Sequence, residues 1–364
     1  MLTPSDVQAL VRELSDTNVL SVYLETRVTD PAMRDAWRPA LQTALRDLAA
    51  TVPERERPDF EQARGSLLGI VPPLGGTWGA EGWVAFVTAD GPRYARELPM
   101  QCPTLAAWRK GPVVAPYMRV LKEHRPVIVA LVDSRSARVY RYAWGSLEEL
   151  PETGLSVPDD VETKLASGSD RRAGASYPAP RSATGTEKEQ QRQFINFERM
   201  ARMLGARLAE LAGDDGWILI GGTPEPSRLA GAALPSRVAD RATVLDTLEH
   251  DATVNEIVGA AQRTATELRA RRGRALLAPL LEHAGAGGRA ASRVPSTQRA
   301  LRANAVDLLV MSPEFVRIDA DEAEEAVRAA LLQGAEVEVL SGDAAADLDL
   351  RADGIAARLR FPVG

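Results

Sequence analysis

Basic side chains gather in one stretch near the middle of the chain, where eight lysines and arginines lie between Arg171 and Arg207. Such side chains bind phosphate groups through charge-assisted hydrogen bonds, with an affinity that depends on salt and little on sequence. Arginine richness also accompanies a GC-rich genome, so codon bias is the competing explanation. The candidates for contact with RNA phosphates are Arg171, Arg172, Arg181, Lys188 and Arg192.

A long helix is expected to hold the last of these residues. The spacing of its apolar residues predicts a helix from Thr186 to Leu211, because they follow each other at intervals of three and four and form one stripe. Toward the start of the helix the same face carries Glu187 and Gln190. We therefore expect the first turns to project past the core. The stripe consists of Phe194, Phe197, Ala201, Leu204, Leu208 and Leu211.

A long polar loop, residues 144–185, precedes this helix. It is acidic at first and then rich in Ser, Gly, Arg and Pro, with almost no hydrophobic periodicity. Loops of this length are rare in compact domains, and those that exist are usually functional or disordered. One interpretation is a tolerated insertion, and the other is an arm that contacts something large. We expect residues 162–183 to be poorly ordered without a partner.

Composition restricts the function. The chain has 364 residues, a net charge of −6 and a single cysteine, Cys102, so it has no cysteine-based zinc site and no intrachain disulfide. Its three histidines are widely spaced, and no nucleotide-binding or triad motif is present. We therefore expect no cofactor, no metal and no small-molecule substrate, but a macromolecular partner. No apolar run reaches the length of a membrane span, which indicates a cytoplasmic protein without a membrane partner.

The alternation of predicted helices and strands indicates an α/β fold with three α/β domains. We place them at 1–115, at 116–274 with the polar loop, and at 275–364. Linkers are expected near 107–116 and 272–275. A second arginine-rich stretch runs from Arg263 to Arg302, with nine arginines against two glutamates.

Two features at predicted strand ends are weaker candidates. Asp133 follows a buried strand, where sites of α/β proteins tend to lie, although such an Asp more often caps a turn. Gly221 and Gly222 follow another strand but lack the spacing of a phosphate-binding loop.

Three segments near the C-terminus carry a family resemblance: Asn304–Met311, Gln333–Ser341 and Asp353–Pro362. They look like the last domain of archaeal and eukaryotic class I release factors and of pelota. The middle domain is similar in layout, whereas the N-terminal domain shows no motif of that family. The chain resembles the bacterial archaeo-eukaryotic release factor family, to which the hibernation factor Balon is close. The resemblance implies release-factor-like or pelota-like middle and C-terminal domains.

The resemblance also implies a function: a tRNA-mimicking factor that binds ribosomal RNA at the A site in hibernation or rescue, with an elongation factor as a further partner. Release factors carry a Gly-Gly-Gln that assists peptidyl-tRNA hydrolysis, and this chain has none. Gln190 and Gln191 stand near the corresponding helix start, so a hydrolase with these catalytic residues stays an alternative. A stress-associated scaffold that binds no ribosome is the third reading.

Overall fold

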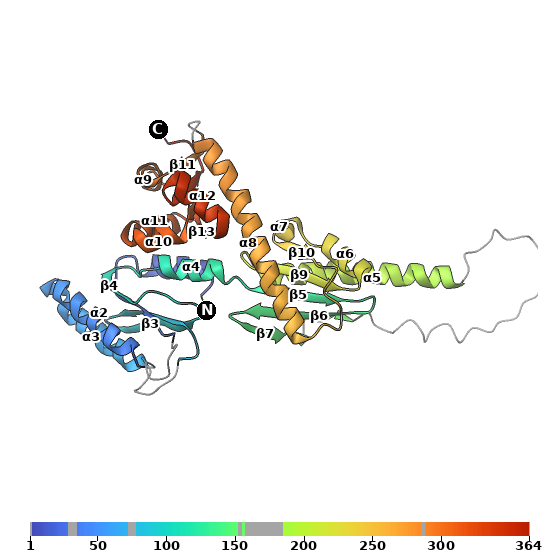
Figure 1. The fold of residues 1–364 in the computed structure, drawn as a ribbon, viewed down its shortest axis with the longest axis horizontal. Helices are drawn as coiled ribbons and strands as arrows, with labels where there is room; N and C mark the ends of the chain where they lie inside the picture. Colours follow the sequence, from blue (N-terminus) through green and yellow to red (C-terminus); the bar gives the residue numbers. More distant parts are fainter. Residues whose placement is uncertain are drawn as a thin grey trace, which may run out of the picture. The chain divides into compact units, whose positions relative to one another are not determined.

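The computed structural model describes residues 2–27, 35–71, 78–151, 155–156, 185–284 and 288–363 (Figure 1). For residues 155–156 and 185–196 the description covers the backbone only. The chain divides into two compact units, Met1–His124 with Arg269–Gly364, and Arg125–Leu268. The expected disorder of residues 162–183 concerns a segment outside the described residues.

The N-terminal portion of the first unit is an antiparallel sheet of order β3-β2-β1-β4. Helices α2 and α3 cover one face, where Trp37, Phe60 and Trp83 form the core. Strands β1 and β2 are buried almost throughout because both of their faces are covered. The elements are α1 Pro4–Glu13, β1 Asn18–Glu25, α2 Trp37–Thr51, the 3-10 helix η2 Glu54–Glu56, α3 Arg57–Ile70, β2 Gly82–Thr88, β3 Gly91–Leu98, β4 Leu105–Lys110 and α4 Ala115–Glu123.

Strand β4 has no counterpart among the elements expected from the sequence. Its residues are all partly or fully exposed, without the alternation that marks a half-buried strand. The strand pairs antiparallel with β1, with Trp108 opposite Leu20. The linker expected at 107–116 is therefore wrong in its first residues, because the sheet continues to Lys110.

The second unit has a mixed sheet of order β10-β9-β5-β6-β7, with β8 also paired to β6. Strands β5, β9 and β10 are parallel, and β6 and β7 are antiparallel to their neighbours. Because successive side chains of a strand point to opposite faces, Ile128 packs toward α5 while Val129 packs toward α8. The elements are β5 Val127–Val132, β6 Ser136–Ala143, β7 Ser146–Glu149, β8 Leu155–Ser156, α5 Gly185–Ala212, β9 Trp217–Gly222, α6 Pro224–Ala232, α7 Ser236–Ala239, β10 Ala242–Val244 and α8 Val254–Ala284.

The predicted loop at residues 144–185 begins with a turn and a strand. Trp144 and Gly145 both have positive φ angles, 56° and 76°, which suits the two-residue turn of a β-hairpin. Ala143 pairs with Ser146 across this turn, and β7 follows. The prediction of a loop is wrong here, because the polar residues of β7 belong to an edge strand and need no apolar alternation.

The C-terminal portion of the first unit is a sheet of order β11-β14-β12-β13, with α8 and α12 contributing to its core. Strands β12 and β13 are parallel, and β14 is antiparallel to β12. The three sheets and their helices confirm the predicted α/β class. The borders 1–115, 116–274 and 275–364 stay a prediction. The elements are β11 Ala290–Ser292, α9 Val294–Arg302, β12 Val306–Met311, α10 Pro313–Ile318, α11 Ala320–Leu332, β13 Glu336–Val339, α12 Gly342–Ala352 and β14 Ile355–Leu359.

The linker expected at 272–275 is wrong, because α8 is continuous through it. Arg272 followed by Gly273 looks like a helix end, yet Leu277 and Leu280 beyond it are buried in the C-terminal core. A Cβ at Gly273 would lie 3.1 Å from the Cβ of Ala344, so the glycine allows α12 to approach closely. Tertiary packing thus outweighs the local stop signal.

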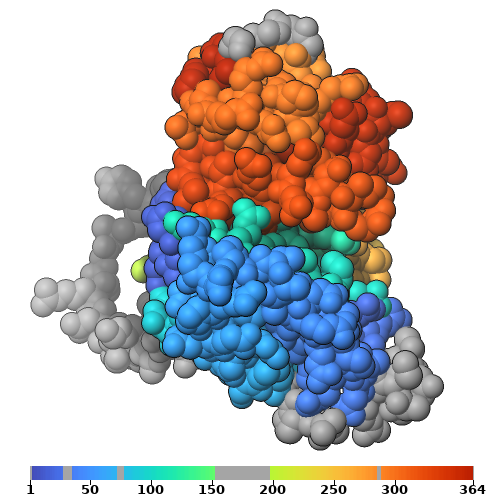
Figure 2. Space-filling view, turned by 90° about the vertical axis from the view of Figure 1, so that its left-hand side faces the viewer, coloured from blue at the N-terminus to red at the C-terminus, as the bar shows by residue number. Residues whose placement is uncertain are grey.

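Within the first unit, the N-terminal and C-terminal portions pack against each other. Figure 2 shows them in blue and in orange to red, with a teal segment between them. Arg328 on α11 donates hydrogen bonds to the carbonyl oxygens of Ser15 at 2.7 Å and Lys110 at 2.6 Å. Gln8 on α1 donates to the carbonyl oxygen of Leu331 at 3.1 Å. Polar contacts to the backbone therefore hold the two portions together.

Candidate functional site

Helix α5 is held to the sheet by the predicted apolar stripe. Ala201, Leu204 and Leu208 are buried in the core with Phe197, and Leu211 packs partly against it. Burying these side chains is the main force that fixes the helix, since an isolated helix gains little from intrinsic propensity. Figure 1 shows the first turns of α5 extending beyond the strands of its sheet. At about 1.5 Å per residue, the 28 residues of α5 span roughly 40 Å.

The predicted site residues fall into two groups. Lys188, Arg192, Gln190 and Gln191 all lie in the first turns of α5, where the backbone is helical and their side chains are outside the description. The candidates Arg171, Arg172 and Arg181 lie outside the described residues. The structure therefore brings the first group together on one helix and leaves the positions of the second group as a prediction.

Farther along α5, where side chains are described, more arginines lie on the face away from the core. Arg199, Arg202, Met203 and Arg207 are exposed and follow the three- and four-residue spacing of one helix face. Met203, with 55% of its surface exposed, lies on the same face. The sequence predicts this basic face, because the arginines follow a helical spacing on the side opposite the apolar stripe.

Carboxylates on the same helix partly neutralise this face. Arg202 lies 3.5 Å from Glu198, and Arg207 lies 2.6 Å from Glu210. Exposed pairs of this kind contribute little to stability, and salt screens them, so both arginines can exchange their partner for a phosphate. Arg199 has no ion pair with any side chain that the structure describes. These three arginines extend the candidate RNA-contact surface toward the C-terminal end of α5.

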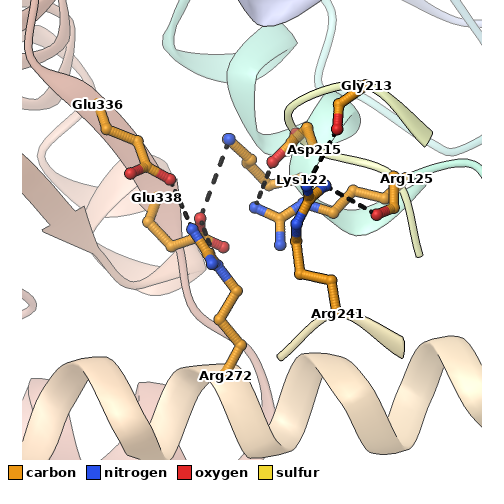
Figure 3. Close-up of polar contacts among 9 residues, drawn as sticks. Lys122, Arg125, Gly213, Asp215, Arg241, Arg272, Glu336 and Glu338 are labelled. Carbon is orange, nitrogen blue, oxygen red and sulfur yellow. Dashed lines mark hydrogen bonds and ion pairs between the residues drawn. The ribbon is translucent and has the colours of Figure 1, made fainter. Parts of the chain in front are cut away.

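Two buried arginines fix the end of α5 (Figure 3). Arg125 is buried, lies 3.0 Å from Asp215 through its Nη2 and places its guanidinium 5.0 Å from the ring centroid of Trp217. Arg241 donates 3.0 Å hydrogen bonds to the carbonyl oxygens of Gly213 and Gly216. The turn between α5 and β9 is therefore tied to the amino-terminal edge of the parallel strands. Neither arginine stood out in the sequence, because each lies among other charged residues, such as Lys122, Glu123 and Asp240.

A separate ion cluster lies in the first unit (Figure 3). The carboxylate of Glu338 on β13 lies 3.5 Å from Nε of Arg272 on α8 and 3.9 Å from Nζ of Lys122 on α4. Arg272 also pairs with Glu336 at 2.6 Å. Lys122 and Glu338 are almost fully buried, and buried charges of this kind persist only when they are paired. The cluster joins three elements and has a structural role.

Asp133 caps a turn. Its Oδ1 accepts the backbone N–H groups of Arg135 at 2.6 Å and Ser136 at 2.5 Å, and its Oδ2 lies 3.3 Å from Nε2 of His250. Burial acts to raise the pKa of Asp133, but these hydrogen bonds and His250 together lower it. The capping alternative fits this geometry. Among the described residues, no group of three or more His, Cys, Asp or Glu side chains is placed to hold a metal ion.

The glycine pair after β9 serves close packing. A Cβ at Gly222, whose φ is +112°, would lie 2.0 Å from the carbonyl oxygen of Val132, and one at Gly221 would lie 2.8 Å from that of Leu248. The N–H of Gly222 also donates to Leu248 at 2.6 Å. The backbone here approaches two neighbours and is not free to cradle a phosphate.

The middle of the chain matches a known family. Residues 112–267 match the model of Bacterial archaeo-eukaryotic release factor family 10. This segment contains the β10-β9-β5-β6-β7 sheet and helix α5. Over these residues the chain is similar to the bacterial archaeo-eukaryotic release factors, which confirms the resemblance drawn from the sequence. The match falls on the middle portion, whereas the most specific sequence motifs lie nearer the C-terminus.

Several solved structures are similar to the chain at low sequence identity. Pelota of Archaeoglobus fulgidus is 16% identical with a TM-score of 0.34, covering 99% of this chain and 93% of its own. A ribosome-bound archaeal Pelota is 13% identical with a TM-score of 0.46, covering 100% and 95%. Dom34 of S. cerevisiae is 10% identical with a TM-score of 0.46, covering 99% and 94%. No curated protein matches the sequence. No helix within the described ranges is both long and apolar enough to cross a membrane.

Proposed function

We propose that the protein is a ribosome-binding translation factor that mimics tRNA and occupies the A site in hibernation or rescue. The observation that carries this proposal is helix α5, Gly185–Ala212. It lies in the segment that matches the release factor family and presents arginines on the face opposite its buried stripe. A long, anchored helix with one basic face is suited to contact RNA phosphates.

The anchoring of α5 matters for this role. Because Arg125 and Arg241 fix the turn at its C-terminal end, the helix keeps its direction when it meets a partner. Pre-organisation of this kind lowers the entropy lost on binding. Contacts between its basic side chains and phosphates contribute affinity that falls steeply with salt.

Occupancy of the site is favoured over hydrolysis. Gln190 and Gln191 belong to a helix, and no Gly-Gly-Gln is present in the chain. Two glycines before a catalytic Gln give the backbone a freedom that Thr186–Glu189 does not have. The residues near the helix start therefore favour binding to the ribosome over catalysis, because they lack the glycines of a mobile catalytic loop.

Ribosome co-sedimentation over a range of salt concentrations tests the proposal. Wild-type protein should sediment with ribosomes, and replacing the five predicted basic residues with Ala should weaken binding and flatten its salt dependence. The five are Arg171, Arg172, Arg181, Lys188 and Arg192. A charge-matched control replaces five exposed arginines of the same unit: Arg135, Arg141, Arg228, Arg237 and Arg263. Wild-type protein that stays unbound at every salt concentration would refute the proposal. If the five-alanine variant binds as tightly as the control variant, these five residues do not contact the ribosome.

Peptide release from stalled ribosomes separates occupancy from hydrolysis. Under the occupancy mechanism, wild-type protein releases no peptide, and Gln190→Ala with Gln191→Ala leaves ribosome binding unchanged. If the wild type releases peptide and the double variant does not, the protein is a hydrolase instead.

A further inference from the structure

One end of the C-terminal sheet brings together three parts of the chain that are separate in sequence. The N–H of Leu359, at the end of β14, donates to the carbonyl oxygen of Arg289 before β11 at 2.9 Å. The N–H of Arg360 donates to Ala305, just after α9, at 2.7 Å. Figure 1 shows α9 and β11 near the C-terminus. The end of α9, the end of β14 and the start of β11 thus meet.

Five exposed arginines lie at this end, and we call them the arginine corner: Arg289, Arg299, Arg302, Arg358 and Arg360. Arg358 pairs with Asp307 at 2.7 Å, and Arg360 donates to the carbonyl oxygen of Gln333 at 3.1 Å. The other three have no ion pair with any side chain in the described part of the chain. Besides Asp307, the nearby carboxylates are Glu282, exposed on the last turns of α8, and Glu336, which pairs with Arg272. The corner therefore carries an excess of positive charge.

A purely structural explanation covers part of this set. Arg299 and Arg302 lie in the last turn of α9, where a positive charge interacts favourably with the helix dipole. Arg358 and Arg360 each hold a neighbouring strand or turn. Arg289 has no such role, and helix stabilisation does not require five arginines on one surface. Helix stabilisation and the contacts of Arg358 and Arg360 therefore do not account for the whole concentration of charge.

The opposite end of the same sheet is acidic. Strand β12 runs from the arginine corner to Met311, and α11 and α12 begin beyond that end. Exposed carboxylates gather there: Asp319, Asp321, Glu322, Asp343 and Asp347. Of the arginines at or near this end, two are paired with carboxylates: Arg293 lies 3.2 Å from Asp353, and Arg317 pairs with Glu314. The charges of the C-terminal portion are therefore separated between its two ends, and only one end can face a polyanion favourably.

We propose that the arginine corner is a second RNA-binding surface, which contacts ribosomal RNA phosphates separately from α5. This inference rests on the proposed ribosome binding. Guanidinium groups match phosphate oxygens with paired hydrogen bonds and are weakly hydrated, so exposed arginines without carboxylate partners are suited to this contact. Binding there depends on the number of phosphates contacted and not on base sequence.

The test uses the full chain with Arg289→Ala, Arg299→Ala and Arg302→Ala. Arg358 and Arg360 are kept because they hold Asp307 and Gln333. The matched control replaces three exposed arginines at or near the acidic end of the same sheet: Arg293, Arg317 and Arg351. Binding to purified ribosomes is measured as a function of salt. The corner variant should bind at least about tenfold more weakly at low salt, with a slope of log affinity against log salt shallower by roughly two to three.

The outcomes separate the two proposals. If the wild type binds ribosomes and the corner variant matches the control in affinity and slope, the arginine corner is not an RNA contact, while the proposed function stands. If the wild type does not bind, the proposed function itself fails. A photo-crosslinking side chain in place of Arg302 identifies the partner: an adduct that ribonuclease digests supports RNA, and one that resists ribonuclease would mean an acidic protein and overturn the inference.

Discussion

The carboxylate of Glu324 on α11 accepts the backbone N–H of Ala115, the first residue of α4, at 2.7 Å. The same oxygen accepts the N–H of Val114 at 2.8 Å, so one buried side chain caps the helix. Its other oxygen is buried without a hydrogen-bond partner among the described residues. A negative charge at a helix N-terminus is favourable, but removing it from water is costly.

The first prediction follows from this conflict. Burial raises the pKa of Glu324 to about 7, although the hydrogen bonds from Ala115 and Val114 and nearby arginines act to lower it. Because the folded pKa exceeds the ordinary value of 4.5, the folded state binds the proton more tightly. The free energy of unfolding should therefore fall as pH rises from about 4.5 through about 7, by roughly 3 kcal/mol.

Urea unfolding of the wild type and of Glu324→Gln at several pH values measures this effect. The variant cannot titrate at this position. The difference in the free energy of unfolding between wild type and variant should therefore change from about pH 4.5 to about pH 7 and stay constant at higher pH. A constant difference at all pH values would show that burial does not perturb Glu324.

The second prediction concerns Arg125. Replacing it with Ala removes its contact with the Trp217 ring and leaves Asp215 without this partner, which should destabilise the second unit by about 3 kcal/mol. Arg237→Ala, at an exposed position of the same unit, should change stability by less than about 0.5 kcal/mol. Chemical unfolding followed by tryptophan fluorescence compares the two. Equal effects would mean that the buried arginine does not fix the turn after α5.

The third prediction separates a steric clash from backbone strain. Gly222→Ala and Gly145→Ala both place a side chain at a positive φ, but only the first meets another atom, the carbonyl oxygen of Val132. Gly145→Ala should cost about 1–2 kcal/mol, the strain of a left-handed residue alone. Gly222→Ala should be clearly worse, and β9 should separate from β5 or the protein should fail to fold. Similar melting temperatures for the two variants would rule out the close approach.

The fourth prediction concerns the carboxylates on α5. Glu198→Gln and Glu210→Gln free Arg202 and Arg207 from their partners and make the exposed face more basic. Ribosome affinity should rise at low salt, and the gain should vanish at high salt because it is electrostatic. The control is Glu225→Gln on α6, an exposed carboxylate of the same unit. A loss of affinity on removing the two glutamates would mean that this face of α5 does not contact RNA.

Strongly periodic segments were predictable from the sequence. The stripe of α5 follows a helical period over several turns, and the continuous apolar run of β5, bounded by Pro126 and Asp133, has a length typical of a buried strand. The sequence did not reveal β4 or α12, because Ala-rich stretches with scattered charges carry no clear period. It also ended α8 at Arg272, since the close contact between Gly273 and Ala344 is a tertiary feature that no local pattern contains.

The candidate site was predictable only as a region. The basic residues of α5 could be found because they recur along one helix. Arg125 and Arg241 became visible only when folding placed them at one turn, since Arg125 precedes β5 and Arg241 precedes β10. The arginine corner depends in the same way on the pairing of β14 with the residues before β11 and after α9. Residues that are distant in sequence come together in these places because of the order in which the strands pair, which the spacing along the chain does not reveal.

The separation of charge in the C-terminal portion makes it an electric dipole. Near a polyanion, one end is attracted and the other repelled, which exerts a torque before any atoms touch. At physiological ionic strength this field extends only about 8 Å, so alignment occurs during the last stage of approach. The rate of productive encounters should therefore fall as salt is added, in addition to the loss of affinity that salt causes in the final complex.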